Sequence, residues 1–270
     1  SRVLLMDCLI RVGRLVDAEQ LLEELDRWNR QQGRTRDYWL VETLGMIAYM
    51  RGELVDAERL LDEATRGFGS LRSRSGQMEA MSYLAWIAID VGKERRARLL
   101  AEQALTMARE DSDVMVEANC LWLLARLALR RGDALEARSI LSECVHVARQ
   151  RDERIVLVLA LQVGADLAYA EADADRAVKL FGAADRHLRA IPHIIPPSVS
   201  EGYDCALADL RETLGDAALE AAWTAGRAMT LDDALAVALG ADGSLHHSTR
   251  AMSPASKTCT TKIGRSEPCV

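Results

Sequence analysis

The sequence has little proline and few aromatic residues. Only five prolines occur among 270 residues, and three of them, Pro192, Pro196 and Pro197, fall close together. Because proline breaks helices, its scarcity elsewhere predicts a long helical body before residue 191. Aromatic side chains make up 4% of the chain, whereas hydrophobic residues as a whole make up 49%, with alanine and leucine prominent. This composition favours helices over strands.

An excess of basic charge is also missing, since the net charge is −7. Proteins that bind nucleic acid need clustered Lys and Arg, so no direct contact with nucleic acid is expected. No apolar run reaches the ~18 residues that span a bilayer, and no signal peptide opens the sequence. The six cysteines form no C-x-x-C pair, which indicates reduced thiols. We therefore expect a cytoplasmic chain without a membrane segment.

Motifs of catalytic or cofactor sites are absent from the sequence. There is no G-x-x-x-x-G-K-[ST] phosphate loop and no recognisable nucleophile constellation. His246 and His247 are adjacent in a polar segment, which favours an exposed pair over a metal site. Asp173 and Asp175 lack the further ligands of a calcium loop and open a predicted helix, where acidic side chains are favourable. We therefore expect no cofactor, no metal and no enzymatic activity.

A repeated pattern runs through the first two thirds of the sequence. Five segments share a small residue, an alanine five positions later, and apolar residues three and four positions beyond that alanine. The small residues are Gly13, Gly52, Gly92, Gly132 and Ala172, at spacings of 39, 40, 40 and 40 residues. A fixed period of this length indicates a solenoid of repeated units.

Each unit is predicted to be a helix-turn-helix hairpin. The glycine ends the first helix and permits a tight turn. Further small residues recur seven positions before it, at Gly45, Ala85, Ala125 and Ala165. We interpret these positions as a seam of close contact with the second helix. Gly67 and Gly69 are interpreted as part of a turn between two units. The predicted fold is thus all-α, an α-solenoid of hairpins.

Three regions are expected along the chain. Residues 1–190 hold five hairpins, and residues 191–240 form a C-terminal helical cap after a proline-rich break. Residues 241–270 hold nine Ser or Thr residues and no apolar periodicity, which predicts a disordered tail. The first unit lacks its opening residues and the sequence begins with Ser1, which favours a piece of a longer protein.

The repeat resembles the tetratricopeptide family. That family's signature combines the turn glycine, the small residue seven positions before it and the alanines five and twelve positions after it, represented here by Gly52, Gly45, Ala57 and Ala64. The family's usual period is about 34 residues, so a longer period implies longer helices. Units of this length look like those of the MalT-type regulators. The resemblance covers residues 1–190.

A second resemblance concerns the end of the array. Leu180–Leu188, Leu210–Gly215 and Ala222–Ala234 are similar to the closing segment of sensor arms in large bacterial ATP-dependent regulators, both LuxR-type and cyclase-linked. In that group an ATPase module precedes the arm and a DNA reader often follows it. The resemblance implies a protein-interaction or effector-sensing module that lacks both parts. The alternative is a free-standing adaptor that binds peptides or partner proteins.

The tetratricopeptide resemblance also assigns a binding groove, because the first helices of that family line the concave surface. The corresponding residues are Trp39, Glu42, Met46, Glu79, Ser82, Trp86, Asn119, Trp122, Arg126, Gln162, Asp166 and Tyr169. Trp86 and Trp122 are predicted to form the centre of the groove, and a protein, a peptide or a small effector is the expected partner. The alternative for the tryptophans is packing between units.

Overall fold

The computed structural model of the chain describes residues 14–32, 36–191 and 197–240. This part of the chain consists of twelve α-helices and contains no strand. The helices are α2 (Leu15–Gln31), α3 (Tyr38–Met50), α4 (Leu54–Ser70), α5 (Arg74–Asp90), α6 (Glu94–Asp111), α7 (Val114–Arg130), α8 (Ala134–Gln150), α9 (Arg154–Ala170), α10 (Ala174–Arg189), α11 (Pro197–Leu214), α12 (Asp216–Ala228) and α13 (Leu231–Ala238). The predicted all-α class is confirmed.

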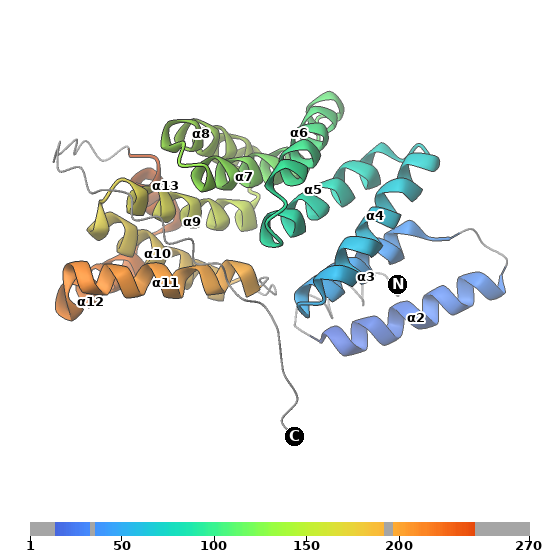
Figure 1. Ribbon diagram of the computed structural model, residues 1–270, viewed down its shortest axis with the longest axis horizontal. Coiled ribbons are helices and arrows are strands. Elements are labelled where there is room, and N and C mark those ends of the chain that lie inside the picture. Colours follow the sequence, from blue (N-terminus) through green and yellow to red (C-terminus); the bar gives the residue numbers. More distant parts are fainter. Residues whose placement is uncertain (1–13, 33–35, 192–196, 241–270) are drawn as a thin grey trace, which may run out of the picture.

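The helices pack in sequence as hairpins. Four complete hairpins, α3–α4, α5–α6, α7–α8 and α9–α10, stack so that each second helix also packs on the first helix of the next hairpin. The pairs follow one another in an arch from α2 to α12 (Figure 1). The predicted solenoid of hairpins is therefore confirmed. Helix α2 corresponds to the second helix of the first predicted unit, and residues 1–13 before it lie outside the described part.

The turns that join successive helices from α3 to α10 are all built in the same way. Seven residues with positive φ, spaced 20 residues apart, form these turns: Gly52, Arg72, Gly92, Ser112, Gly132, Asp152 and Ala172. The N–H group of the next residue donates to the carbonyl five positions earlier, as from Glu53 to Ala48 at 2.9 Å and from Asp133 to Ala128 at 3.0 Å. This bond closes the Schellman motif. The repeat thus divides into two equal halves, each one helix and one turn.

The interpretation of Gly67 and Gly69 as a turn between units is wrong, because both lie inside α4. A Cβ atom at Gly67 would collide with the ring of Tyr38 in α3, and one at Gly76 in α5 would collide with buried Phe68. Gly67 and Gly76 therefore make room for aromatic rings between α3, α4 and α5. The chain reverses direction only afterwards, at the turn that follows α4.

The seam of small residues is present within the hairpins. A Cβ atom at Gly45 would lie 2.9 Å from Cγ of Leu61, in the second helix of the same hairpin. The equivalent residues Ala85, Ala125 and Ala165 are fully buried. The prediction of close helix contact at Gly45 is confirmed, although this glycine meets a leucine rather than another small residue.

Three further helices follow the array. Helix α12 packs along α10, and α13 packs against α9. A Cβ atom at Gly182 would lie 2.5 Å from the carbonyl oxygen of Trp223, and Gly226 faces the backbone of Lys179 in the same manner. The backbones of α10 and α12 are thus in direct contact. The proline-rich residues 192–196 and the predicted tail at 241–270 lie outside the described residues.

Buried side chains form one large cluster that extends from α5 to α13, with smaller clusters between α2, α3 and α4. Alanine is frequent among them because closely packed helices leave little volume between their axes. None of the described helices combines the length and the apolar character that crossing a membrane requires.

Candidate functional site

The first helices of successive hairpins, α3, α5, α7 and α9, lie next to one another. We call the surface that they form the first-helix face. All twelve predicted groove residues belong to these four helices. Glu42, Ser82, Trp122 and Gln162 are buried, Met46, Glu79, Trp86, Asn119 and Arg126 are half-buried, and Trp39, Asp166 and Tyr169 are exposed. The predicted groove residues therefore differ in how deeply they are buried.

Aromatic rings join the first three of these helices. Tyr49 of α3 meets Trp86 of α5 edge-on at a centroid distance of 6.1 Å, and Trp86 meets Trp122 of α7 edge-on at 4.7 Å. The Trp122 ring is only 1% exposed, and its Nε1 donates to the carbonyl of Leu159 in α9 at 3.2 Å. Edge-to-face pairs of this kind stabilise helix packing.

Trp122 therefore packs between units, which is the alternative that the sequence left open for the tryptophans. Its burial and its hydrogen bond to α9 leave no surface for a partner. Trp86 differs, because it is half-buried and its Nε1 has no hydrogen-bond partner. The two tryptophans are thus in contact with each other, but they differ in exposure and in hydrogen bonding.

A chain of polar contacts crosses the same face. The Tyr49 hydroxyl donates to the Asp90 carboxylate, and Asp90 lies 3.7 Å from the guanidinium of Arg126. That guanidinium sits 4.9 Å above the Trp122 ring, in a cation–π arrangement. These contacts connect α3, α5 and α7. Desolvation raises the pKa of Asp166 in α9 to about 6, and the positive charge of Arg126 opposes this rise.

Two glutamates, Glu42 and Glu79, lie on the adjacent helices α3 and α5 and interact electrostatically. Glu42 is only 4% exposed, and its Oε1 has no hydrogen-bond partner. Burial raises its pKa to about 9, with a further contribution from the negative charge of Glu79. Glu79 is half-buried and accepts a hydrogen bond from the Tyr83 hydroxyl at 3.3 Å. Burial also raises the pKa of Glu79, the bond from Tyr83 opposes this, and the charge of Asp113 adds to it.

Three buried polar atoms without a partner lie on the first-helix face. They are Oε1 of Glu42 in α3, Nε1 of Trp86 in α5 and Nη1 of Arg126 in α7. Within the described ranges the only other such atom belongs to Arg176, on α10. Buried polar groups are nearly always hydrogen-bonded, and each exception calls for an explanation. Three exceptions on adjacent helices mark this face as the candidate site.

The ends of the predicted groove are occupied by neighbouring elements. Trp39, which is 46% exposed, packs edge-on against Phe68 of α4 at 4.8 Å. The Tyr169 hydroxyl donates to the Asp209 carboxylate of α11 at 2.9 Å. The central part of the face, between α3 and α7, therefore holds the atoms that lack partners.

Tyr49 and Asp90 belong to the site, although the sequence interpretation missed them. Tyr49 lies three residues after Met46, and Asp90 lies four residues after Trp86. Residues at these spacings share one face of a helix. Extending the predicted groove by one turn would have found both.

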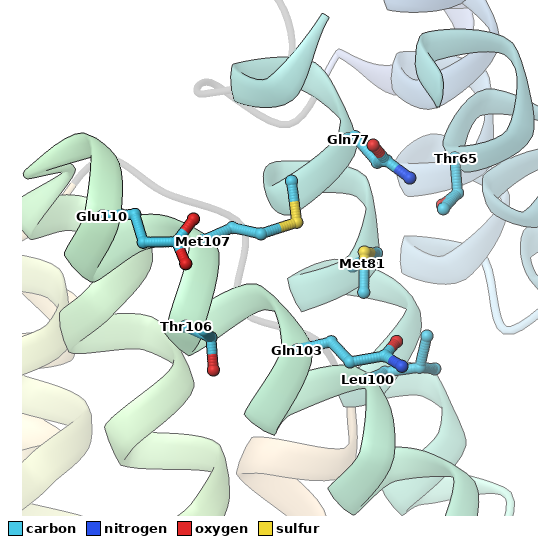
Figure 2. A pocket seen from close by; sticks show the side chains of 8 residues that line it. All are labelled: Thr65, Gln77, Met81, Leu100, Gln103, Thr106, Met107 and Glu110. Carbon is cyan, nitrogen blue, oxygen red and sulfur yellow. The ribbon is translucent and has the colours of Figure 1, made fainter. Parts of the chain in front are cut away.

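Two hollows lie elsewhere on the molecule. One cavity of about 480 Å³ opens between α4, α5 and α6, and Figure 2 shows the side chains around it. Its lining consists of Thr65, Gln77, Met81, Leu100, Gln103, Thr106, Met107 and Glu110. A second, of about 430 Å³, lies near the start of α3 and includes Tyr38, Trp39 and Phe68. Neither contains the unpartnered atoms of the first-helix face.

Two thiols lie inside the array. Cys120 and Cys144 are free and buried, and burial raises the pKa of each to about 12. Protonated, inaccessible thiols are poor nucleophiles and poor metal ligands. Among the described residues no group of three or more His, Cys, Asp or Glu is arranged to hold a metal ion.

Comparisons with known proteins bear on the fold. No family model matches the sequence, and a search of curated proteins finds no match. Among solved structures, the chain is similar to a Rap protein complexed with competence and sporulation factor, with a TM-score of 0.58. The likeness shows the fold. The two chains share 14% sequence identity, and the alignment covers 86% of this chain and 74% of the other. This chain therefore has a tetratricopeptide-like helical repeat.

Proposed function

We propose that this chain is a binding module whose first-helix face receives a segment of a protein or peptide partner. The observation that carries the proposal is the set of buried, unpartnered atoms of Glu42, Trp86 and Arg126 on three adjacent helices. A polypeptide supplies both hydrogen-bond donors and acceptors, and could therefore satisfy all three. Leaving such groups unsatisfied costs stability, which a bound partner would restore.

The architecture supports the same proposal. Stacked hairpins create an extended surface to which every unit contributes one helix, and solenoids commonly bind partners along such surfaces. The similar Rap protein was solved with competence and sporulation factor bound. This analogy comes from the fold alone. It supports a factor-binding role here without identifying the factor.

The finer proposal is that the module serves as the sensor arm of a bacterial signalling or transcriptional regulator. Its support is the resemblance of Leu180–Leu188, Leu210–Gly215 and Ala222–Ala234 to the closing segment of such arms. A free-standing adaptor is equally compatible with the fold. Sequencing the encoding DNA upstream separates the two, because a phosphate loop in the same reading frame favours the regulator.

Peptide selection tests the binding proposal. The immobilised chain is used to select from a displayed library of random twelve-residue peptides, and the selected peptides are measured by calorimetry. Trp86→Phe removes the unpartnered N–H group and is expected to weaken binding about tenfold. Trp223→Phe, on α12, is the matched control and should bind as the parent does. Failure to enrich any peptide, or equal affinity of Trp86→Phe and parent, contradicts the proposal.

A further inference from the structure

The strip of the first-helix face between α3 and α5, which we call the α3–α5 lane, holds an acidic pair without a counter-ion. The buried Oε1 of Glu42 has no partner, and the Glu79 carboxylate accepts a hydrogen bond from the uncharged Tyr83 hydroxyl. The charges that act on these two carboxyls belong to Glu79 and Asp113, both negative. No cation of the described residues neutralises the pair.

Two other acidic side chains of the array, Glu58 and Asp90, have cationic partners. Glu58 accepts hydrogen bonds from Lys93 at 2.7 Å and also pairs with Arg96. Asp90, which is similarly buried, pairs with Arg126. Burying a carboxyl without a charge partner or a full set of hydrogen bonds is costly. Glu42 and Glu79 in the α3–α5 lane therefore lack the cationic partner that Glu58 and Asp90 have.

The lane also presents a donor at a fixed distance from the acids. Trp86 follows Glu79 by seven residues, which is about 10.5 Å along an α-helix. The Trp86 indole N–H is buried and unpartnered, so it requires an acceptor. Half-buried Met46, 40 residues before Trp86, occupies the equivalent position on the facing helix. The lane thus combines an acidic end with a methionine and an N–H donor at the other end.

We infer that the α3–α5 lane is the subsite for a positively charged group of the bound segment, with Glu42 and Glu79 holding the cation and Trp86 donating to a backbone carbonyl. This inference rests on the proposed function and narrows its partner to a basic peptide segment. An extended chain advances about 3.3 Å per residue, so the carbonyl lies about three residues from the charged group. A lysine or arginine side chain, or a terminal amine, supplies the same chemistry.

An acidic segment is disfavoured in this lane. The negative charges of Glu79 and Asp113 already raise the pKa of the carboxyls on which they act, and they would likewise oppose a second anion. Arg126 on α7 does not reverse this preference, because its guanidinium already lies beside Asp90 and over Trp122. A cation, in contrast, favours loss of the proton from Glu42 and supplies the donor that its Oε1 lacks. Charge-assisted hydrogen bonds of this kind are the stronger ones in proteins.

The composition of the selected peptides tests the inference. Peptides enriched from the random library by the parent chain are expected to share a lysine or an arginine at one position. The double variant Glu42→Gln, Glu79→Gln should lose that enrichment. Glu220→Gln, an exposed position on α12, together with Glu102→Gln on α6, changes the net charge equally and should keep it. Thermal melts of all three proteins verify that each is folded.

Synthetic peptides then locate the charge. Replacing the shared basic residue by methionine should weaken binding to the parent at least about tenfold, and should change binding to the double variant far less. Acetylating the peptide's N-terminus distinguishes a side-chain cation from a terminal amine. If acetylation alone removes binding, the terminal amine is the cation.

The outcomes separate this inference from the proposed function. Enriched peptides that are sensitive to Trp86→Phe but show no basic preference overturn the α3–α5 subsite and leave the binding face intact. A basic preference that persists in the double variant also overturns the subsite, because the attraction then comes from the overall negative charge. Absence of any enriched peptide overturns both proposals.

Discussion

The α3–α5 lane and the equivalent strip between α7 and α9 come from the same repeat, yet they treat their polar groups differently. Between α7 and α9, the buried indole of Trp122 donates to the Leu159 carbonyl. Between α3 and α5, the buried Oε1 of Glu42 and the Nε1 of Trp86 have no partner. One strip is satisfied internally and the other is incomplete. Departures from internal consistency are expected where a protein binds something else.

The largest loss of stability is expected in the strip between α7 and α9, where the polar groups are paired. Trp122→Ala removes a fully buried ring, its edge-on contact with Trp86, its cation–π contact with Arg126 and a hydrogen bond, and should lower the free energy of unfolding by about 3–5 kcal/mol. Trp86→Ala should cost less, because that ring is half-buried and its N–H has no partner to lose. Urea denaturation followed by circular dichroism measures both. Equal losses would remove the contrast between the two strips.

The next prediction concerns the incomplete strip. Glu42 has a pKa raised from 4.5 to about 9, so folded chain binds a proton that the unfolded chain releases between these values. The free energy of unfolding should therefore fall as pH rises from about 5 to about 9. Glu42→Gln should reduce this slope and stabilise the fold by about 1–3 kcal/mol at pH 8.

Urea midpoints at pH 6 and pH 8.5 measure this effect, and Glu220→Gln provides the exposed control. Glu79, Tyr83 and Asp113 remain in the variant, so part of the pH dependence is expected to persist. A Glu42→Gln protein that is less stable than the parent at pH 8.5 would mean that the carboxylate is satisfied in the folded state. A Glu42→Gln protein that is more stable than the parent but binds peptide more weakly would show that Glu42 lowers the stability of the fold while it contributes to binding.

A substitution in the seam of small residues tests whether damage to the α3–α4 hairpin reaches the α3–α5 lane before the strip between α7 and α9. Gly45→Leu places a side chain where even a Cβ atom would lie 2.9 Å from Leu61. Forced separation of α3 and α4 should cost about 1–3 kcal/mol, and it should alter the α3–α5 lane before the strip between α7 and α9. Hydrogen exchange can follow both regions. Uniform loss of protection along the whole array would contradict the expectation that Gly45→Leu destabilises the neighbouring units first.

The smallest expected effect lies at the turn after α9. Ala172 has a positive φ, whereas Gly52, Gly92 and Gly132 occupy the equivalent turns after α3, α5 and α7. Ala172→Gly should relieve the Cβ strain and raise the free energy of unfolding by a few tenths to about 1 kcal/mol. Gly132→Ala is the reciprocal variant and should destabilise by a similar amount. Thermal melts that move in the same direction for both would refute this account.

The repeat register and the hairpins could be predicted because their turn residues leave a visible signal. Glycine or alanine recurs at 52, 92, 132 and 172. The other turns have positive φ at Arg72, Ser112 and Asp152, which share no residue type, so the division of the repeat into equal halves could not be recognised. Backbone hydrogen bonds rather than side chains define those turns.

The sequence assigns the candidate site to the first helices as a prediction, but it does not indicate how deeply the residues of that site are buried. Helical spacing places Trp86 and Trp122 on the first helices. Whether a ring is open or covered depends on the neighbouring unit, and α9 covers Trp122 with its backbone at Leu159. Likewise, nothing in the sequence alone indicates that Glu42 is buried beside another acid. Such facts arise from contacts between units.

The equal spacing of the turns fixes which helices are first helices and which are second helices along the array. First and second helices alternate every 20 residues, and the αL residues mark the step. Loss or gain of a 40-residue block would keep each remaining helix on its own side and simply shorten or lengthen the surface. Loss of a 20-residue block would exchange the roles of all later helices, so that α7 and α9 would leave the first-helix face. Length changes in this chain are therefore tolerable only in whole periods.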